Sequence, residues 1–172
     1  YLPFVIQAAA NGLNAYPMVN AVWAQEKIVL RKNVNIGIAV ATDKGLIVPV
    51  IKAADTKNIA QLSREINELA QRARSNKLSL DEISEGTFTV NNTGALGSIM
   101  SVPIINLHQT AIITSETIVS RPVVVDGEVA IRSIMNICIS FDHRIIDGAD
   151  AAKFLKHIKT SLETIAPLAP II

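Results

Sequence analysis

The chain has 172 residues, of which 49% are hydrophobic, 18% charged and 4% aromatic, and its formal net charge is +1. This length suits a domain with a sizeable core, and the composition argues against disorder. The small net charge gives no sign of a nucleic-acid groove or a membrane-binding surface, and no apolar run is long enough to cross a membrane. The single cysteine, Cys138, cannot form an internal disulfide and is interpreted as a core residue rather than a nucleophile.

The first half of the chain shows one apolar helix and then short β-branched runs. The helix is predicted to begin near Pro3, which suits a first turn, and to end near Pro17. The strands expected next are residues 21–23, 27–30, 35–41 and 46–51. The last two are separated by a turn that contains Gly45, which predicts a hairpin, and Pro49 is expected at a bulge or an edge.

Residues 58–75 carry the strongest helical pattern in the sequence. Apolar side chains recur at helical spacing, which predicts a buried face made of Ile59, Leu62, Ile66, Leu69, Ala70 and Ala73. Asn58 is predicted to cap this helix together with Gln61, three residues later. The charged side chains of the helix are interpreted as a solvated face.

The second half of the chain is predicted to hold mostly strands and then a final helix. A short helix is expected near Ser79, and residues 91–101 are expected to form a loop. The expected strands are residues 87–90, 110–119, 122–125, 129–131 and 133–141. The final helix, residues 151–165, is expected to bury Ala152, Leu155, Ile158, Leu162 and Ile165. The tail 166–172 contains two prolines and is expected to end that helix.

No internal repeat, linker or change of composition divides the sequence, so residues 1–172 are predicted to form one domain. The order helix, strands, helix, strands, helix favours an α+β fold. Its sheet is expected to be mixed, with the helices packed mainly on one side.

The stretch Asp142–Gly148 holds the strongest candidate for catalysis. His143 and Asp147 lie four residues apart, where a predicted strand meets the start of a helix. An imidazole suits reversible deprotonation near neutral pH, because its ordinary pKa is about 6.5. The carboxylate could orient the ring, support its protonated state or hold a neighbouring arginine. A lone histidine near an aspartate is more often part of a charged surface turn, so the motif needs wider context.

That context is a family resemblance. Asp142-His143-Arg144-Ile145-Ile146-Asp147-Gly148 resembles the Asp-His-Arg-x-x-Asp-Gly signature of the dihydrolipoamide acyltransferases, the core components of 2-oxo acid dehydrogenase complexes. Further segments that resemble the family, in the family's order, are residues 1–4, 35–42, 45–51 and 86–94. The resemblance is strongest to bacterial branched-chain members, and it implies a chloramphenicol acetyltransferase-like fold. It also implies an acyltransferase catalytic domain whose N-terminal part is missing from this sequence.

The resemblance implies acyl transfer between a dihydrolipoyl arm and coenzyme A, with both thiols as substrates and no metal. A thiol is mostly protonated at neutral pH, so a base must take its proton as it attacks the thioester, and His143 is the candidate. Asn91 matches the position at which many members carry a serine or threonine that donates a hydrogen bond to the oxyanion. The alternative for Asn91 is a strand-end residue that bonds its own backbone. Asp147 is expected to hold the turn through an arginine or backbone groups.

The remaining polar candidates are given supporting roles. Asp142 and Arg144 are interpreted as structural supports of the turn, and His108 and His157 as surface or packing residues. No His, Cys, Asp or Glu cluster has metal-ligand spacing. No glycine-rich phosphate loop is present either, so the residues that bind coenzyme A are not identified from the sequence.

The resemblance also implies partners. Family members form homotrimers with active sites at subunit boundaries, and the trimers build cubic or dodecahedral cores that work with a lipoyl domain, a decarboxylase and dihydrolipoamide dehydrogenase. His143 would come from one chain and Asn91 from its neighbour, and the apolar tail 166–172 is expected to contact another trimer. The expected location is the cytoplasm, or the mitochondrial matrix in a eukaryote. An inactive structural core subunit and an antibiotic acetyltransferase are the alternatives, and the acyl group stays open among acetyl, succinyl and branched-chain.

Overall fold

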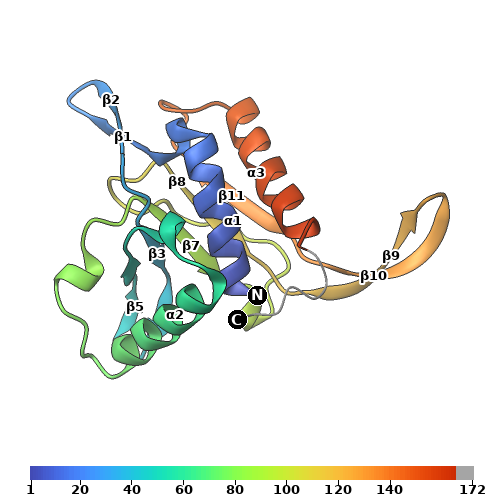
Figure 1. Ribbon diagram of the computed structural model, residues 1–172, viewed down its shortest axis with the longest axis horizontal. Helices are drawn as coiled ribbons and strands as arrows, with labels where there is room; N and C mark the ends of the chain where they lie inside the picture. Colours follow the sequence, from blue (N-terminus) through green and yellow to red (C-terminus); the bar gives the residue numbers. More distant parts are fainter. Residues whose placement is uncertain (166–172) are drawn as a thin grey trace.

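A five-stranded mixed β-sheet forms the centre of the computed structural model, which describes residues 1–165 (Figure 1). Its strands are β3 (Ile36–Ile38), β6 (Val50–Ile51), β7 (Phe88–Asn92), β8 (Ala111–Ser115) and β11 (Ile137–Phe141). They are ordered β11-β8-β7-β3-β6. β8, β7 and β3 run parallel to one another, whereas β11 and β6 pair antiparallel at the two edges. The mixed sheet is as predicted.

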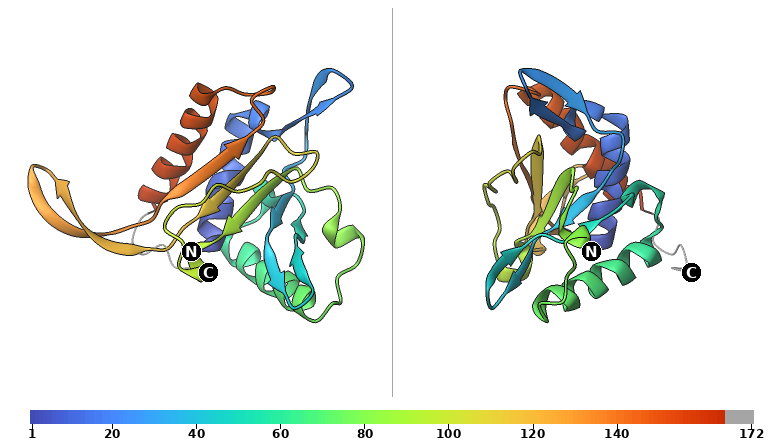
Figure 2. Two further views of the ribbon diagram at one scale, coloured as in Figure 1. Left: turned by 180° about the vertical axis from the view of Figure 1, so that it is seen from behind. Right: turned by 90° about the vertical axis from the view of Figure 1, so that its left-hand side faces the viewer.

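Three helices cover one face of this sheet: α1 (Leu2–Ala15), α2 (Ile59–Arg74) and α3 (Gly148–Glu163). The side view in Figure 2 shows the helices on one side and loops on the other. Phe88 of β7 and Phe154 of α3 meet edge to face at the centre of the core, with ring centroids 5.6 Å apart. The α+β class with helices on one side is therefore confirmed.

The helix α2 follows its prediction closely. The Asn58 side chain accepts a hydrogen bond from the Gln61 amide at 2.9 Å, and the Gln61 side chain accepts one from the Asn58 amide at 2.9 Å. This reciprocal cap satisfies two backbone donors that the helix start leaves unpaired. The fully buried side chains of α2 are Leu62, Ile66, Leu69 and Ala73, all of them on the predicted face.

The buried face of α3 differs from the prediction. The buried side chains are Ala151, Phe154 and Ile158, whereas Leu155 and Leu162 are half-buried and Ala152 and Ile165 are exposed. The helix is rotated because the Phe154 ring inserts against Gly12 of α1, where an added Cβ would lie 2.8 Å from the ring. The contact of the Phe154 ring with Gly12 decides which side of α3 faces the core. The expectations for the tail 166–172 lie outside the described residues.

The strands of the first half pair as hairpins, and only the second hairpin differs from the prediction. β1 (Ala21–Ala24) and β2 (Lys27–Leu30) pair as predicted. The predicted hairpin 35–51 is divided, because β4 (Val40–Thr42) and β5 (Gly45–Ile47) form its tip and β3 and β6 its base. Pro49 lies at the break between β5 and β6, and its carbonyl accepts a hydrogen bond from Ile38 N at 2.8 Å. A proline without an N–H suits this interruption.

In the second half, β9 (Val119–Val125) and β10 (Glu128–Ile134) form an arm that projects from the body of the protein (Figure 1). The expected strands 110–119 and 133–141 are therefore each shorter than predicted, because the arm takes their ends. The expected helix near Ser79 is a single 3-10 turn, Asp81–Ile83. Asn91 belongs to β7 rather than to the predicted loop. No helix in the described part is long and apolar enough to span a membrane.

Candidate active site

His143 lies exposed on a tight turn between β11 and α3. The Asp142 amide donates to the Thr110 carbonyl at 2.8 Å, and the Ile145 amide donates to the Asp142 carbonyl at 3.0 Å. Ile145 and its neighbour Ile146 are buried, so they fix the far side of the turn in the core. The imidazole is left outside, with its ring centroid 5.5 Å from that of Phe141. The turn thus presents His143 to solvent on a rigid support.

Asp147 caps the start of α3. Its carboxylate accepts hydrogen bonds from the Ala149 amide at 2.8 Å and the Asp150 amide at 3.0 Å. The backbone N–H of Asp150, followed by that of Ala149, holds the pKa of Asp147 below its ordinary value, and Lys153 and then His143 add smaller effects. Asp147 therefore joins the turn to the helix through backbone groups, one of the two arrangements expected from the sequence.

Arg144 ties the turn to the β1–β2 hairpin. Its Nε donates to Asp142 Oδ1 at 2.9 Å and its Nη2 to Asp142 Oδ2 at 2.6 Å, which is a two-point contact. The guanidinium also lies 5.4 Å from the ring centroid of Trp23. The Arg144 hydrogen bond is the main reason that the pKa of Asp142 lies below its ordinary value. Trp23 was not among the predicted site residues, because one tryptophan in a short strand gives no functional signal.

Asn91 lies near the end of the sheet that is opposite to the His143 turn. Val90 is buried in the core, so Asn91 points to the helix-free face, where it is half-buried. In the strand register Asn91 pairs with Thr114 of β8, and Thr114 pairs with Cys138 of β11. Cys138 is half-buried in this row, so the prediction of a core position was wrong. It faces away from the helices because its neighbours Ile137 and Ile139 pack against the core.

One chain does not bring the two predicted catalytic side chains together. Cys138, which shares a row with Asn91, is five residues before His143, and β11 runs away from the Asn91 end of the sheet. At about 3.3 Å per residue along a strand and about 4.8 Å between strands, the Asn91 and His143 backbones are on the order of 15–20 Å apart. A site that uses both residues needs a second chain.

The other two histidines lie where surface and packing residues are expected. His108 is exposed in a loop turn with a φ of 63°. His157 packs on the ring of Tyr16, with centroids 5.8 Å apart. Within residues 1–165, no three His, Cys, Asp or Glu side chains come together in a way that could hold a metal ion.

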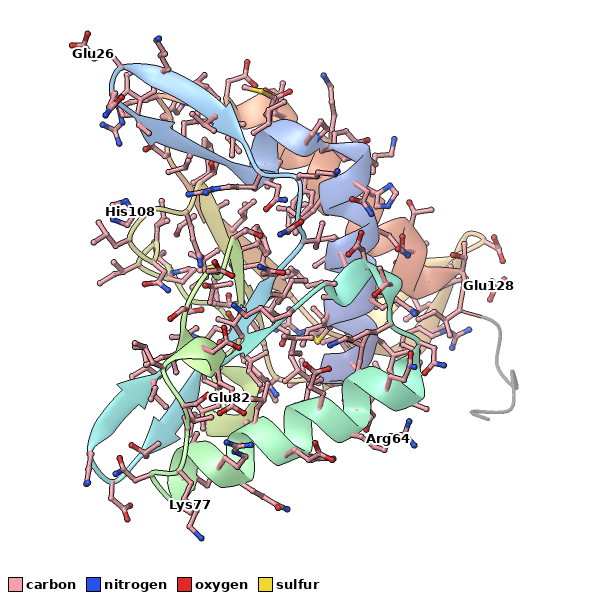
Figure 3. The ribbon with its side chains drawn as sticks, turned by 60° about the vertical axis from the view of Figure 1, so that its left-hand side comes forward. Glu26, Arg64, Lys77, Glu82, His108 and Glu128 are labelled. Atoms are coloured by element: carbon pink, nitrogen blue, oxygen red, sulfur yellow. The ribbon has the colours of Figure 1, made fainter. Side chains whose placement is uncertain are left out.

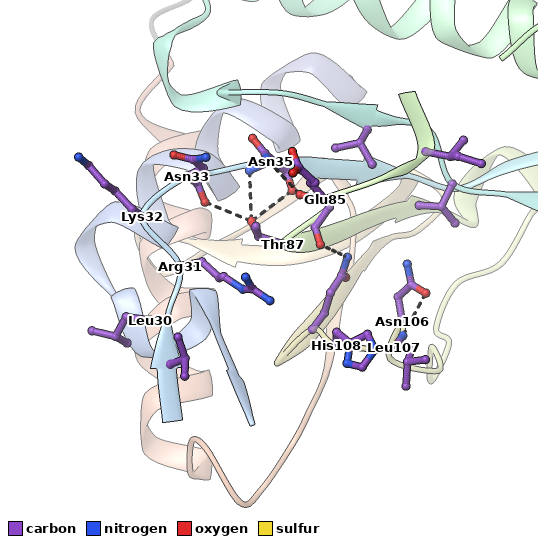
Figure 4. Close-up of a pocket in the computed structure, with 16 residues that line it drawn as sticks. Leu30, Arg31, Lys32, Asn33, Asn35, Glu85, Thr87, Asn106, Leu107 and His108 are labelled. Carbon is purple, nitrogen blue, oxygen red and sulfur yellow. Dashed lines mark hydrogen bonds between the residues drawn. The ribbon is translucent and has the colours of Figure 1, made fainter. Parts of the chain in front are cut away.

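A hollow of about 990 Å³ opens at the end of the sheet where β7 and β8 begin, which is also the end at which the His143 turn lies. It lies between the β1–β2 hairpin and the loop around His108, whose exposed position is visible in Figure 3. Arg31 points across the hollow towards this loop (Figure 4). At the back of the hollow, the Thr87 hydroxyl donates to the backbone carbonyls of Asn33 and Asn35. The hollow shares no lining residue with the His143 turn.

Residues 1–169 match the model of the family described as 2-oxoacid dehydrogenases acyltransferase (catalytic domain). The chain belongs to this family. Its predicted relationship is therefore confirmed over nearly the whole sequence.

Two curated relatives show which members it is similar to. The lipoamide acyltransferase component of the branched-chain alpha-keto acid dehydrogenase complex of Bacillus subtilis is 47% identical over 96% of this chain and 39% of its own length. The succinyltransferase component of the 2-oxoglutarate dehydrogenase complex of Bartonella vinsonii is 44% identical over 95% of this chain and 40% of its own length. The chain thus spans about two fifths of these curated relatives.

Solved structures share its fold. A probable dihydrolipoamide acetyltransferase from Listeria monocytogenes superposes with a TM-score of 0.96 at 48% identity, covering 98% of this chain and 72% of that one. The cubic core of a pyruvate dehydrogenase multienzyme complex gives 0.92 at 37% identity, covering 95% and 68%. A chloramphenicol acetyltransferase gives 0.61 at 16% identity, covering 94% and 77%, which confirms the predicted fold alone.

A further solved structure concerns catalysis. The dihydrolipoamide acetyltransferase of Azotobacter vinelandii gives a TM-score of 0.92 at 36% identity, covering 95% of this chain and 68% of that one. It was investigated for the role of a serine, a histidine and an asparagine in its catalytic mechanism. In that protein the histidine follows the serine by 52 positions and precedes the asparagine by four.

Proposed function

We propose that residues 1–172 are the single catalytic domain of a dihydrolipoamide acyltransferase, which moves an acyl group between a dihydrolipoyl thiol and coenzyme A. The observation that carries the proposal is a spacing. Asn91, His143 and Asp147 are separated by 52 and four positions, as are the serine, histidine and asparagine investigated in the Azotobacter enzyme. This equal spacing supports the choice of Asn91, His143 and Asp147 as the site residues.

His143 is proposed as the general base. Its ring is exposed at the end of a rigid turn, so a thiol can approach it. It takes the proton from the attacking thiol while the sulfur forms a bond to the thioester carbonyl carbon. The tetrahedral intermediate then collapses, the original carbon–sulfur bond breaks, and the leaving thiolate takes the proton back from the imidazolium. These reaction steps need neither a metal ion nor a covalent acyl-enzyme.

Asn91 is proposed as the oxyanion donor. Its side-chain NH₂ can donate to the negative oxygen of the intermediate, as the hydroxyl of a serine could. Asp147 is proposed as a positioning residue, because its carboxylate holds the start of α3 four residues after His143.

The site is proposed to form between neighbouring chains of a trimer. His143 and Asn91 lie at opposite ends of one sheet, so a neighbour must supply the missing half. Two surfaces support association. The β9–β10 arm is a two-stranded ribbon with exposed Val124, Val129 and Ile131, and such ribbons are marginal alone. The loop after β7 exposes Leu96, Ile99, Met100, Val102, Ile104 and Leu107. Exposed apolar patches of this kind mark interfaces.

Larger assembly follows from the same proposal. The trimers would build the core of a 2-oxo acid dehydrogenase complex and work with a lipoyl domain, a decarboxylase and dihydrolipoamide dehydrogenase. A relative of the same fold forms a cubic core. The acyl group stays open, since one similar relative is a branched-chain component and another a succinyltransferase.

A transfer assay tests the proposal. The purified chain is given acetyl-, succinyl- and isobutyryl-coenzyme A with dihydrolipoamide, and in parallel acetyl-coenzyme A with chloramphenicol. Transfer to dihydrolipoamide that depends on His143 is the expected result. Acetylation of chloramphenicol alone would point to an antibiotic-modifying enzyme, and a trimer without transfer to any acceptor would point to an inactive core subunit.

A further inference from the structure

Glu116 is a buried carboxylate at the end of β8 with 2% exposure. Among the described residues it forms no salt bridge with Lys, Arg or His. An isolated buried charge costs several kcal/mol unless other groups replace its hydration. The side chains around Glu116 must therefore stabilise its carboxylate.

Three hydroxyl groups surround the carboxylate. Ser101 Oγ donates to Oε1 at 2.6 Å, Thr114 Oγ1 donates to Oε1 at 2.7 Å, and Thr93 Oγ1 donates to Oε2 at 2.7 Å. Burial by itself would raise the pKa of Glu116, but these hydrogen bonds outweigh it and lower the pKa to about 2. The carboxylate is therefore charged throughout the physiological range and each oxygen is occupied.

The hydroxyl donors lie close to Asn91, the proposed oxyanion donor, either along the chain or on the neighbouring strand. Thr93 is two residues after Asn91, and Thr114 is the partner of Asn91 in the β7–β8 register. Ser101 lies in the connection between β7 and β8, whose first part, residues 93–101, is called the 93–101 loop. One carboxylate thus joins the end of β7, the end of β8 and the far end of this loop.

The backbone contacts of the 93–101 loop converge on the same place. Thr117 Oγ1 donates to the Gly94 carbonyl at 2.8 Å, and Thr117 N donates to the Ser98 carbonyl at 2.8 Å. A Cβ on Gly94 would lie 2.3 Å from the Glu116 carbonyl carbon, so only glycine allows this approach. Leu96, Ile99 and Met100 are exposed and do not anchor the loop in this chain. The loop is held by these polar contacts and by Asn136, whose Nδ2 donates to the Ile99 carbonyl at 2.7 Å.

We propose that Glu116 is a positioning residue that holds the Asn91 end of β7 and the 93–101 loop in the geometry required of the oxyanion donor. The catalytic part of this inference rests on the proposed function. Glu116 does not touch the reacting atoms, since its oxygens are occupied by hydroxyl groups. It acts through Thr93 and Thr114, which set the position of the strand segment that carries Asn91.

The test compares Glu116→Gln with Glu68→Gln, which removes an exposed carboxylate on α2. Glu116→Gln should lower kcat about tenfold or more with a smaller change in KM, because the misplaced donor matters mostly in the transition state. In an Asn91→Ala background the same substitution should cost less than about twofold, since coupled residues are not additive. Additive losses, or a kcat within about twofold of the parent, would overturn the positioning role.

A second measurement separates this inference from the proposed function. Amide hydrogen exchange in the 93–101 loop should accelerate about tenfold or more in Glu116→Gln and remain unchanged in Glu68→Gln, whether or not the chain transfers acyl groups. If the parent protein is inactive, the proposed function fails while exchange still tests the attachment of the loop. Unchanged exchange would overturn the inference. Should Glu116→Gln not fold, Thr93→Val removes one donor at nearly constant shape and is expected to give the same pattern more weakly.

Discussion

Asn91 and His143 lie at opposite ends of one β-sheet, Asn91 near the end of β7 and His143 beyond the end of the antiparallel β11. The separation follows from topology, because the chain reverses direction between β8 and β11. In the proposed trimer, each chain therefore contributes half of two sites rather than the whole of one.

Replacing His143 by alanine should remove most of the transferase activity. Loss of a general base costs on the order of 10²–10⁴ in rate, and the ring is exposed, so the fold should survive. Steady-state assays and thermal melting measure the two quantities. His108→Ala, which removes another exposed histidine, is the matched control. Activity within about threefold of the parent for His143→Ala would contradict the assignment.

Three substitutions at Asn91 separate an oxyanion donor from a structural amide. Asn91→Ala should lower kcat by on the order of 10²–10³ with a smaller effect on KM, because the donor is needed in the transition state. Asn91→Ser should recover part of this loss, since a hydroxyl can donate from nearly the same place. Asn91→Asp should be worse than Ala, because its charge repels the oxyanion. If kcat instead follows the melting temperature and Asp is tolerated as well as Ser, Asn91 has only a structural role.

The stack of Arg144 on Trp23 should matter for activity more than its exposure suggests. Arg144→Lys keeps the charge but loses the two-point contact with Asp142 and the planar stack. We expect kcat to fall roughly tenfold through misplacement of the turn that carries His143, with little loss of stability. Arg64→Lys, at an exposed position on α2, provides the control. Equal kcat values for the two variants would show that the contact does not position the histidine.

Glu116 should make stability depend on pH in the acid range. Its pKa is lowered from 4.5 to about 2, so the stabilising contribution is complete above pH 4.5 and is lost as the pH falls towards 2. The shift corresponds to on the order of 3 kcal/mol in the free energy of unfolding. Urea denaturation of the parent and of Glu116→Gln should therefore show a difference at pH 6 that shrinks by about this amount near pH 2. A difference that does not change with pH would contradict the hydroxyl cluster as its source.

The sequence allowed the site residues to be chosen but not placed. The signature around His143 and the Asn91 position are local in the chain, so a resemblance of short segments was sufficient to find them. Trp23 and Glu116 are different, because their importance depends on contacts with Arg144 and with three hydroxyl residues that are far away in the sequence. No local pattern of residue types distinguishes a buried glutamate of this kind from one on the surface.

The fold shows the same division. The helix α2 was predicted with its cap and face because both depend on spacing within 16 residues. The buried face of α3 was predicted only in part. Ile158 is buried as expected, but Phe154 was missed because its insertion against Gly12 is a tertiary contact. The strands 110–119 and 133–141 were predicted to be too long, because a continuous β-branched run does not reveal where the chain leaves the sheet to form a projecting arm.

Mixed trimers test the shared active site most directly. His143→Ala and Asn91→Ala chains, each nearly inactive alone, are co-expressed in equal amounts so that they assemble together. If each site takes His143 from one chain and Asn91 from the next, a random mixture restores about one quarter of the parent activity, because both intact residues then meet at about one site in four. Activity no higher than that of the separate variants, in trimers shown to contain both chains, would contradict a site built between neighbouring chains.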